Sequence, residues 1–556
     1  MPTNATISEQ FELLSKLMDI HQENSFKSKS YSSAAFAIDK LPFELETFEK
    51  GKIASIKGIG ESSAKKIIEI LETGRLSVLD ELINKTPEGV LDMLRIKGLG
   101  PKKIATIWHE MGIETIGELL YACNENRLLL YKGFGEKTQN NVAEAIEFFM
   151  RNQGHFLYAD VESYVEKVKE ILSARFPSNQ FLIGGDFFRQ MPTLDELVWI
   201  TDAPLSMVQD FLAEIAFIIE SNGTDQFIAK GPENLRMLFI HAESTNIDQI
   251  QFEKSVSPGF LENWKKNFDT LNISSIEPSN WLNTFGINFI PTFLREDPSI
   301  IEDAKNTRFD EIISTDQIKG IIHSHSNWSD GSNTIEEMAL ACIAQGFEYL
   351  VISDHSKSAF YANGLNEERI KAQHQYIDEL NKKLAPFKIF KSIESDILND
   401  GALDYSDNLL STFDMVIASV HSNLKMSEEK AMSRLLTAIE NPYTTVLGHP
   451  TGRLLLSRKG YPIDHEKIID ACIANDVVIE INAHPRRLDL DWTWIKIAQE
   501  KGAILSINPD AHHIDGYHDV KYGVLAAQKG GLKKQNNLSS YSLQEIESYL
   551  NRFRKA

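Results

Sequence analysis

The residues best suited to chemistry in this 556-residue chain gather in its C-terminal part, where eleven of the fifteen histidines lie between Ile321 and Ala556. Many follow short apolar runs typical of buried strands, as in FEYLVISDHS and DMVIASVHS. Nine imidazoles and carboxylates stand at or just after such runs: His323, His325, Asp330, His355, Glu394, His421, His449, Asp510 and His512. This donor set suits Zn, Mn or Fe and exceeds one tetrahedral site. We therefore expect two or three divalent ions, with Glu394 as a candidate bridge.

The sequence after Lys319 also predicts the strands and helices that position these donors. After Lys319, seven apolar runs alternate with helical stretches, which predicts a barrel of parallel strands. Functional groups of such barrels lie at the carboxyl ends of the strands, which is where the nine donors fall. Histidines scattered over core and surface are the alternative, and the ordered placement argues against it.

A Lys-Gly-x-Gly tetrapeptide occurs three times in the N-terminal 150 residues, for which the sequence predicts helices. The tetrapeptides KGIG, KGLG and KGFG each precede an amphipathic helix. Glycines let a backbone approach closely, and the free amides of a helix start attract phosphate, with lysine adding charge. One copy could be only a tight turn, but three favour sequence-independent contact with a DNA backbone. The candidate DNA-binding residues are Lys57, Gly58, Gly60, Lys97, Gly98, Gly100, Lys132, Gly133 and Gly135.

The three segments resemble helix-hairpin-helix motifs, and their order resembles bacterial family-X DNA polymerases of the PolX type. HSHSNWSDG, GHPTGRLL and INPDAHH resemble the PHP (polymerase and histidinol phosphatase) domain of that family. The resemblance places all nine donors on metal-ligand positions, with His323, His325, Glu394 and Asp510 as catalytic residues. It also implies that Arg453 binds phosphate and that Lys66 occupies the position of a lyase lysine, although a solvated helix lysine is favoured there.

The polymerase palm implied by the resemblance has lost carboxylates. Asp195 matches the first metal-binding aspartate, whereas Leu197 and Asn234 stand where the second and third are expected. Two-metal nucleotidyl transfer needs all three, so we expect no polymerisation. A register error is the alternative, with Asp186 or Glu196 as ligands.

The resemblance implies a multidomain fold: all-α helix-hairpin-helix lobes, an α/β nucleotidyltransferase-like palm and a C-terminal PHP domain with a distorted (β/α)7 barrel. The expected divisions are an N-terminal helical lobe at 1–80, a fingers-like lobe at 81–150, the degenerate palm at 151–242, a thumb-like region and linker at 243–317, and the nuclease domain at 318–556.

Composition and charge bear on the partners and the cellular compartment of the protein. The formal net charge of −22 would normally argue against nucleic acid, but charge is local and metal-bound carboxylates are neutralised. Cys123, Cys342 and Cys472 form no CxxC pair, and neither a transmembrane stretch nor a secretion signal is recognised. We expect a reduced cytoplasmic monomer without membrane contact.

The expected activity is metal-dependent phosphodiester hydrolysis on DNA. The resemblance implies 3′→5′ exonuclease action, with abasic-site cleavage as a further activity in base-excision repair. Three alternatives stay open: a PHP phosphomonoesterase, a protein with residual polymerase activity, and a non-enzymatic DNA-binding scaffold. The hairpins argue against the first, and the full donor set argues against the last.

Overall fold

The computed structural model describes residues 2–41, 43–151, 154–231, 234–268 and 280–551. Residues 269–279 of the expected thumb-like region and 552–556 of the expected nuclease domain lie outside the described residues. The chain forms two compact units, one of residues 1–124 and 128–147 and the other of 125–127 and 148–556. No helix within the described ranges is long and apolar enough to cross a membrane.

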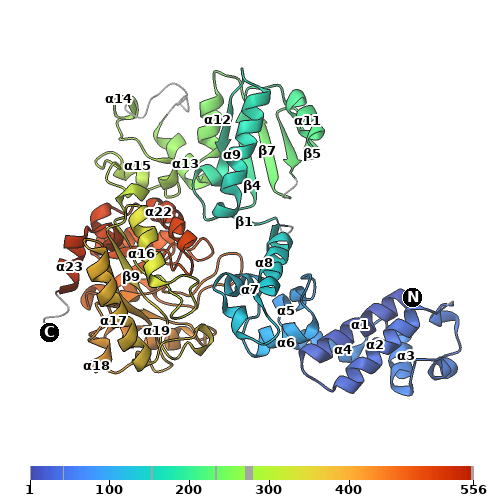
Figure 1. Cartoon of the computed structure of the whole chain (residues 1–556). Helices are drawn as coiled ribbons and strands as arrows, with labels where there is room; N and C mark the ends of the chain where they lie inside the picture. The colour runs from blue at the N-terminus through green and yellow to red at the C-terminus, as the bar shows by residue number, and fades with distance from the viewer. Residues whose placement is uncertain (1, 42, 152–153, 232–233, 269–279, 552–556) are drawn as a thin grey trace. The chain divides into compact units, whose positions relative to one another are not determined.

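The first unit is helical, as predicted (Figure 1). In α1 the side chains of Ile7, Phe11, Leu14 and Met18 recur at helical spacing and are buried, which is the apolar face that packs on α2. The helices are α1 (Asn4–Ile20), α2 (Ser25–Asp39), α3 (Glu61–Thr73), α4 (Ser77–Lys85), α5 (Glu88–Met93), α6 (Pro101–His109), α7 (Ile116–Asn124) and α8 (Glu136–Arg151).

The second unit begins with a five-stranded sheet in the order β2-β4-β7-β6-β5, in which only the β4–β7 pair is parallel. Its strands are β2 (Phe181–Gly184), β4 (Glu196–Thr201), β5 (Ile218–Asn222), β6 (Gln226–Lys230) and β7 (Arg236–His241). One face packs on α9 (Tyr158–Arg175) and α11 (Leu205–Glu214), and the other on α12 (Ile247–Lys254). Both faces of β4 are therefore apolar.

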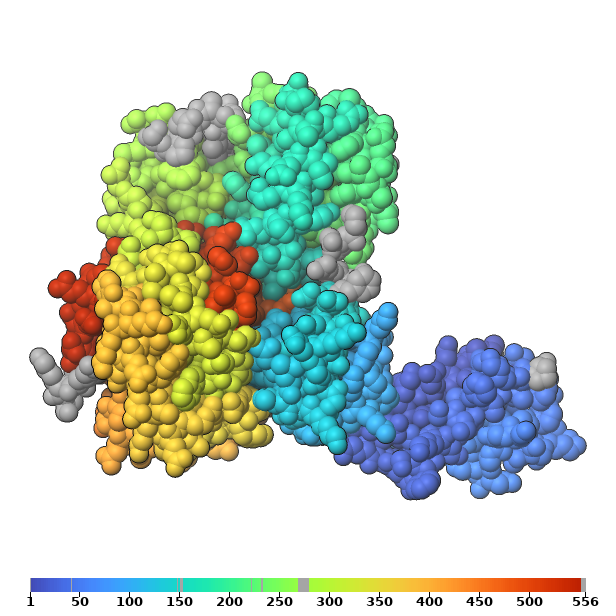
Figure 2. Space-filling model, in the orientation of Figure 1, coloured from blue at the N-terminus to red at the C-terminus, as the bar shows by residue number. Residues whose placement is uncertain are grey.

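A helical segment follows, with α13 (Pro258–Asn267), α14 (Trp281–Phe285) and α15 (Ile300–Asp303). Its core is aromatic and includes Phe260, Trp264 and Trp281. Residues 281–312 lie against the C-terminal barrel in the space-filling view (Figure 2), and Lys496 of the barrel binds Asp303 at 2.8 Å.

The C-terminal part is the predicted barrel. Seven parallel strands run in sequence order: β8 (Gly320–Ile321), β9 (Tyr349–Ile352), β10 (Lys388–Asp396), β11 (Met415–Ser419), β12 (Val446–Leu447), β13 (Val478–Asn482) and β14 (Leu505–Asn508). A parallel bridge between Ser324 and Ala511 draws the first and last strands together, so the barrel nearly closes. The outer helices include α16 (Ile335–Ala344), α17 (Glu367–Leu384), α19 (Glu428–Ile439), α20 (His465–Ala474), α21 (Trp492–Lys501) and α22 (Val520–Lys529).

Strand alternation divides the interior of the barrel into an apolar floor and a polar mouth. Phe390, Met415 and Val478 point inward and pack with Leu538 and with α23 (Leu543–Asn551). Further along the strands, the same alternation turns Glu394 and Glu480 inward, at positions four and two residues after Phe390 and Val478. Because parallel strands end at one rim, the polar side chains meet at the mouth.

Candidate metal centre

The mouth of the barrel holds all nine donors predicted from the sequence. Eight are buried, and the side chain of His421 is 5% exposed. Two of them occupy left-handed backbone conformations, with φ of 61° at His323 and 53° at Asp510. Non-glycine residues rarely adopt such angles, and they concentrate at functional sites. The turns that end β8 and β14 are thus shaped to aim side chains.

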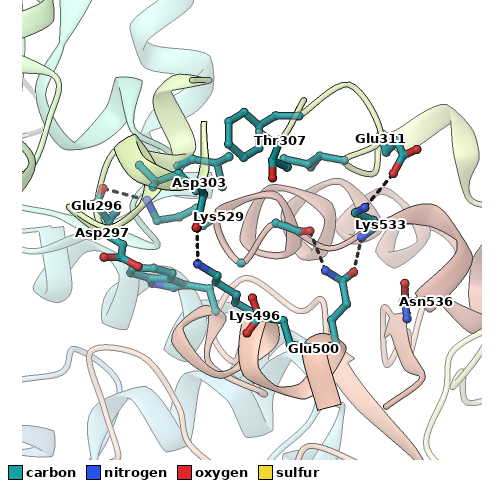
Figure 3. Close-up of a pocket in the computed structure, with 18 of the residues that line it drawn as sticks. Glu296, Asp297, Asp303, Thr307, Glu311, Lys496, Glu500, Lys529, Lys533 and Asn536 are labelled. Carbon is teal, nitrogen blue, oxygen red and sulfur yellow. Dashed lines mark hydrogen bonds and ion pairs between the residues drawn. The ribbon is translucent and has the colours of Figure 1, made fainter. Parts of the chain in front are cut away.

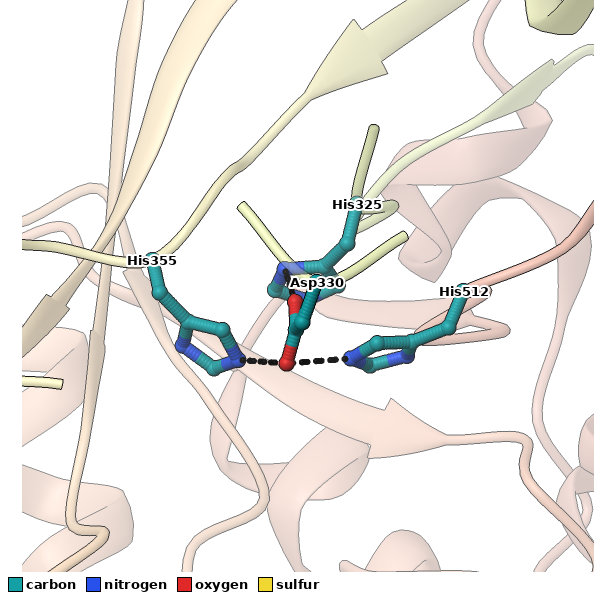
Figure 4. A group of neighbouring side chains, drawn as sticks. All are labelled: His325, Asp330, His355 and His512. Carbon is teal, nitrogen blue, oxygen red and sulfur yellow. Dashed lines mark ion pairs between the residues drawn. The ribbon is translucent and has the colours of Figure 1, made fainter. Parts of the chain in front are cut away.

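One group of donors consists of His325, Asp330, His355 and His512 (Figure 4). The Asp330 carboxylate lies between two imidazoles, with its Oδ2 3.4 Å from His355 Nε2 and 3.5 Å from His512 Nε2. Ligands at about 2.1 Å from a tetrahedral ion would be roughly 3.4 Å apart. The spacing therefore matches a shared ion.

Two further groups are joined to the first by shared residues. One is His323, His325 and Asp510, and the other is His355, Glu394 and His421. Glu394 offers Oε2 to His355 at 2.9 Å and Oε1 to His421 at 3.2 Å, and the same Oε1 lies 3.0 Å from His449. Glu394 therefore has the position of a bridging ligand.

Several donor atoms fit cations because their neighbours are other donors and they make no hydrogen bond of normal geometry among the described residues. Several are buried without a hydrogen-bond partner among the described residues: His323 Nε2, His325 Nδ1, Asp330 Oδ2, both ring nitrogens of His355, Glu394 Oε2, His449 Nδ1 and His512 Nε2. Leaving a buried polar atom unpaired costs about 1–3 kcal/mol. A cluster of such atoms directed at common points fits the requirement for divalent metal.

A second layer of carboxylates orients the imidazoles. Glu480 accepts a hydrogen bond from the His323 ring at Nδ1 (2.8 Å) and another from the backbone N–H of His449 (2.8 Å). Asp396 lies 2.8 Å from His421 Nδ1. Each contact turns the Nε2 atom of the imidazole toward the centre. Neither carboxylate was predicted from the sequence, although the strand alternation of VIEIN places Glu480 on the inward face.

Asp354 was also missed as a positioning residue. Its carboxylate accepts hydrogen bonds from the Ser326 N–H (2.8 Å), from the Ser326 hydroxyl (2.6 Å) and from Gln373 (2.6 Å). It holds the loop between His325 and Asp330. Asp354 directly precedes the donor His355, and no separate sign in the sequence indicated that Asp354 positions the loop.

Within this centre, burial and the charges of neighbouring groups shift the pKa values of several donors in opposite directions. Burial lowers the pKa of His449 to about 3, and the nearby Arg487 acts in the same direction. Burial also disfavours charge on His421, but Glu394 and Asp396 outweigh it and raise that pKa to about 9. For Asp330, burial opposes ionisation, yet His355 and His512 hold the pKa well below its usual range. Asp330 is thus ionised at neutral pH, which is the state that binds cations.

Arg453, the predicted phosphate ligand, is bonded within its own part of the barrel. Its Nε donates to the carbonyl of Arg487 at 2.9 Å, and its terminal nitrogens donate to Asp491 and to the Leu488 carbonyl. These bonds brace the loop after β13, so phosphate binding by Arg453 stays a prediction. Arg487 lies nearer the donors, with Nε 3.8 Å from Asp510 Oδ2.

The three hairpin turns of the helical unit share one geometry. Gly58, Gly98 and Gly133 have φ of 94°, 94° and 96°. The residue after each of these glycines is buried, namely Ile59, Leu99 and Phe134, whereas Lys57, Lys97 and Lys132 are exposed. Gly60 and Gly100 are the N-cap residues of α3 and α6, and neither helix has a side-chain cap. The first amides of these helices are thus left for an external anion.

Lys66 lies on α3 with its Nζ 5.5 Å from the centroid of the Tyr31 ring. This cation–π geometry supplies a structural role for the side chain. A lyase role stays a prediction.

The five-stranded sheet changes the interpretation of the palm. Leu197 is fully buried with Trp199 in the core that packs on α9. A carboxylate at position 197 would point into that core, so this position is not an open ligand site. Glu196 and Val198 alternate to the opposite face, where a Cβ on Gly185 would come within 2.7 Å of Val198. On that face the described part of β4 presents one carboxylate, Glu196.

Asp195 and Asn234, the other two palm residues, flank the strands. Asp195 is exposed and pairs with His155 at 2.6 Å. Asn234 precedes β7 with a φ of 63° and donates its backbone N–H to Gly231. The loss of polymerase chemistry stays a prediction.

A hollow of about 720 Å³ lies apart from the metal centre, between residues 294–312 and helices α21 and α22 (Figure 3). Three lysines line it, and each pairs with a carboxylate: Lys496 with Asp303 (2.8 Å), Lys529 with Glu296 (3.0 Å) and Lys533 with Glu311 (2.8 Å). The lysine charges are compensated by the protein itself.

Comparisons with known proteins agree with this geometry. A helix-hairpin-helix domain matches residues 2–76, a SAM-like helix-hairpin-helix tandem matches 90–147, and a PHP domain matches 322–484. A probable phosphatase of Caldanaerobacter subterraneus is 30% identical over 29% of this chain and 60% of its own length. DNA polymerase lambda of Rattus norvegicus is 28% identical over 27% of this chain and 26% of its own length.

One relative matches nearly the whole chain. The DNA polymerase/3′-5′ exonuclease PolX of Bacillus subtilis is 33% identical over 97% of this chain and 98% of its own length. The helical hairpins, the five-stranded sheet and the metal-binding barrel thus occur in one continuous match, and the chain belongs to the PolX family.

Proposed function

We propose that this chain is a metal-dependent DNA phosphodiesterase that removes nucleotides from 3′ ends in DNA repair in the cytoplasm. The observation that carries the proposal is the cluster of buried imidazoles and carboxylates at the mouth of the barrel, several of whose atoms have no hydrogen-bond partner among the described residues. A scaffold protein would not retain unpaired polar atoms at that cost.

The donor groups support two or three ions of Mn, Zn or Fe, held by the nine residues named above. Divalent ions at such a site polarise a phosphoryl oxygen and lower the pKa of water. The protein contributes orientation. Glu480 and Asp396 fix the rings of His323 and His421, and Asp354 fixes the loop that carries Asp330.

DNA is the proposed substrate because of the helical unit. Three turns of equal geometry present uncapped or glycine-led helix starts beside exposed lysines. Contacts of this kind recognise phosphate without reading base sequence. A phosphatase acting on a small molecule would have no use for them. We also propose that the chain acts as a monomer, with the five-part division given above, and that abasic sites are a second substrate.

The test uses the full chain with Mn²⁺, 3′-labelled single-stranded DNA and p-nitrophenyl phosphate. Hydrolysis of DNA from the 3′ end, lost in His323→Ala with His325→Ala, is the expected result. Hydrolysis of the monoester alone would favour the phosphomonoesterase alternative. Binding of DNA without any hydrolysis would favour a scaffold. An oligonucleotide with an internal abasic site tests the second substrate.

A further inference from the structure

The loop after β9 begins and ends at the metal centre. It starts at His355, and Leu365 returns to donate its N–H to the His355 carbonyl at 2.9 Å. Phe360 lies midway, five residues after His355, so its Cα is at most about 18 Å from that of the histidine. Because the chain turns back within these residues, the actual separation is shorter. Phe360 is 78% exposed.

The loop is held firmly although the phenyl ring is exposed. Asn363 donates its side-chain amide to the carbonyls of Trp328 (3.2 Å) and Ser329 (3.3 Å). Arg369 donates to the Asn363 carbonyl at 2.7 Å. Ala359 and Ala362 on either side of Phe360 are fully buried. The exposure of Phe360 therefore results from a fixed backbone that directs the ring outward.

Tyr361, the next residue of the loop, turns its hydroxyl into the protein. Tyr361 packs edge-on against Phe360, with the ring centroids 5.8 Å apart. Its hydroxyl is buried without a hydrogen-bond partner among the residues described. Burial raises the pKa of Tyr361 well above its usual value; the charge of Arg127 opposes this shift, and the charges of Asp396 and Glu394 add to it. Leu365 bonds to His355 and Asn363 bonds to Ser329, the residue before Asp330, so the loop that carries Phe360 is tied to the rim of the metal centre.

We propose that Phe360 is a stacking platform for a nucleobase next to the phosphate that is cleaved. This inference rests on the proposed function and specifies how the site engages single-stranded DNA. Every base has a π-face, so a phenyl ring binds it without regard to sequence. A ring on a fixed loop loses little conformational entropy on binding.

The size and surroundings of this apolar contact favour a base over a protein partner. The neighbouring Lys357, Ser358 and Asn363 are exposed and polar, so the apolar surface is about one ring wide. Protein interfaces need a broader apolar core. Lys357 is paired with Glu367 at 2.9 Å, so the expected contact rests on stacking and not on a free charge.

The experiment compares the full chain with Phe360→Ala and Phe360→Trp in Mn²⁺. The substrates are a normal single-stranded oligonucleotide and oligonucleotides with a tetrahydrofuran abasic analogue at the terminal or the penultimate 3′ position. Leu340→Ala on α16 is the control, because Leu340 is an exposed apolar residue of the same barrel, at 49%.

For Phe360→Ala we expect a KM on normal DNA raised roughly fivefold to a hundredfold, as stacking energies of 1–3 kcal/mol per base imply. The effect should disappear on one of the abasic substrates, and Phe360→Trp should restore normal KM. Leu340→Ala should leave it unchanged.

Two negative results are distinguishable. If the unaltered chain fails to hydrolyse DNA, the proposed function fails and this inference falls with it. If the unaltered chain hydrolyses DNA, an unchanged KM in Phe360→Ala overturns the inference alone. An equal loss on normal and on both abasic substrates also overturns it. Retained metal content shows that Phe360→Ala has kept its fold.

Discussion

The barrel and the five-stranded sheet of the second unit are both mixed helix-and-strand structures, but they differ in what lies at their strand ends. In the barrel, inward alternation delivers Glu394 and Glu480 to a mouth already lined with imidazoles. In the five-stranded sheet, the face under Gly185 carries Val198 and the partly buried Glu196. The hydrophobic core is complete in both regions. The comparison shows that a hydrophobic core is enough to stabilise a fold. Metal chemistry also needs several donors that point toward one position.

The largest expected effect tests the barrel. His323→Ala with His325→Ala should reduce DNA hydrolysis at least about a hundredfold, because groups that stabilise transition-state charge contribute on this scale. Metal analysis of the purified protein should show fewer bound ions. His518→Ala, an exposed histidine of the same barrel, is the matched control. Unchanged hydrolysis in the double variant would break the assignment.

A smaller effect is expected from the second layer. Glu480→Gln removes the charge that orients His323 and receives the His449 amide. Changes of this kind cost about tenfold to a hundredfold in metal affinity or activity. Titration of the metal-free chain with Mn²⁺, read by recovery of hydrolysis, measures this loss. Glu466→Gln, on the outer helix α20, should have no effect, and a normal titration for Glu480→Gln would contradict the orienting role.

The helical unit should contribute affinity rather than chemistry. Replacing Lys57, Lys97 and Lys132 together by alanine should weaken binding to single-stranded DNA about tenfold at low salt. The salt dependence of log K should flatten by about two, since each lysine lost on single strands changes the slope by roughly 0.7. Replacing the exposed Lys169, Lys382 and Lys430 is the control. Equal losses in the two triple variants would refute a specific role for the hairpins.

The smallest expected effect concerns the sheet. We expect no template-dependent extension of a gapped primer with Mg²⁺ or Mn²⁺ when the nuclease is disabled at His323 and His325. Asp195→Ala and Glu196→Ala should then change nothing. Extension that either substitution abolishes would show that the sheet still catalyses nucleotidyl transfer, and the contrast between the two regions would disappear.

The barrel and its donors were predictable because the signals are local. The nine donors fall at or just after strand-like runs, and seven such runs alternate with helices, so order and spacing alone indicated a common rim. The hairpins were equally accessible, since KGIG, KGLG and KGFG each contain the glycine that the left-handed turn requires. The side of the sheet that Leu197 faces was not predictable, because the direction of a strand residue depends on where the strand begins. A shift of one residue exchanges the two faces of a sheet.

The donors that the protein carries, their order and the glycine turns of the hairpins follow from the sequence alone, because covalent spacing and side-chain chemistry set these features. The tertiary structure decided which donors share an ion, that Glu480 orients His323 across 157 residues, and that Arg453 braces a loop. Such contacts join segments distant in the chain. They arise only when the packing of every intervening strand and helix brings the segments together, and no local pattern encodes that packing.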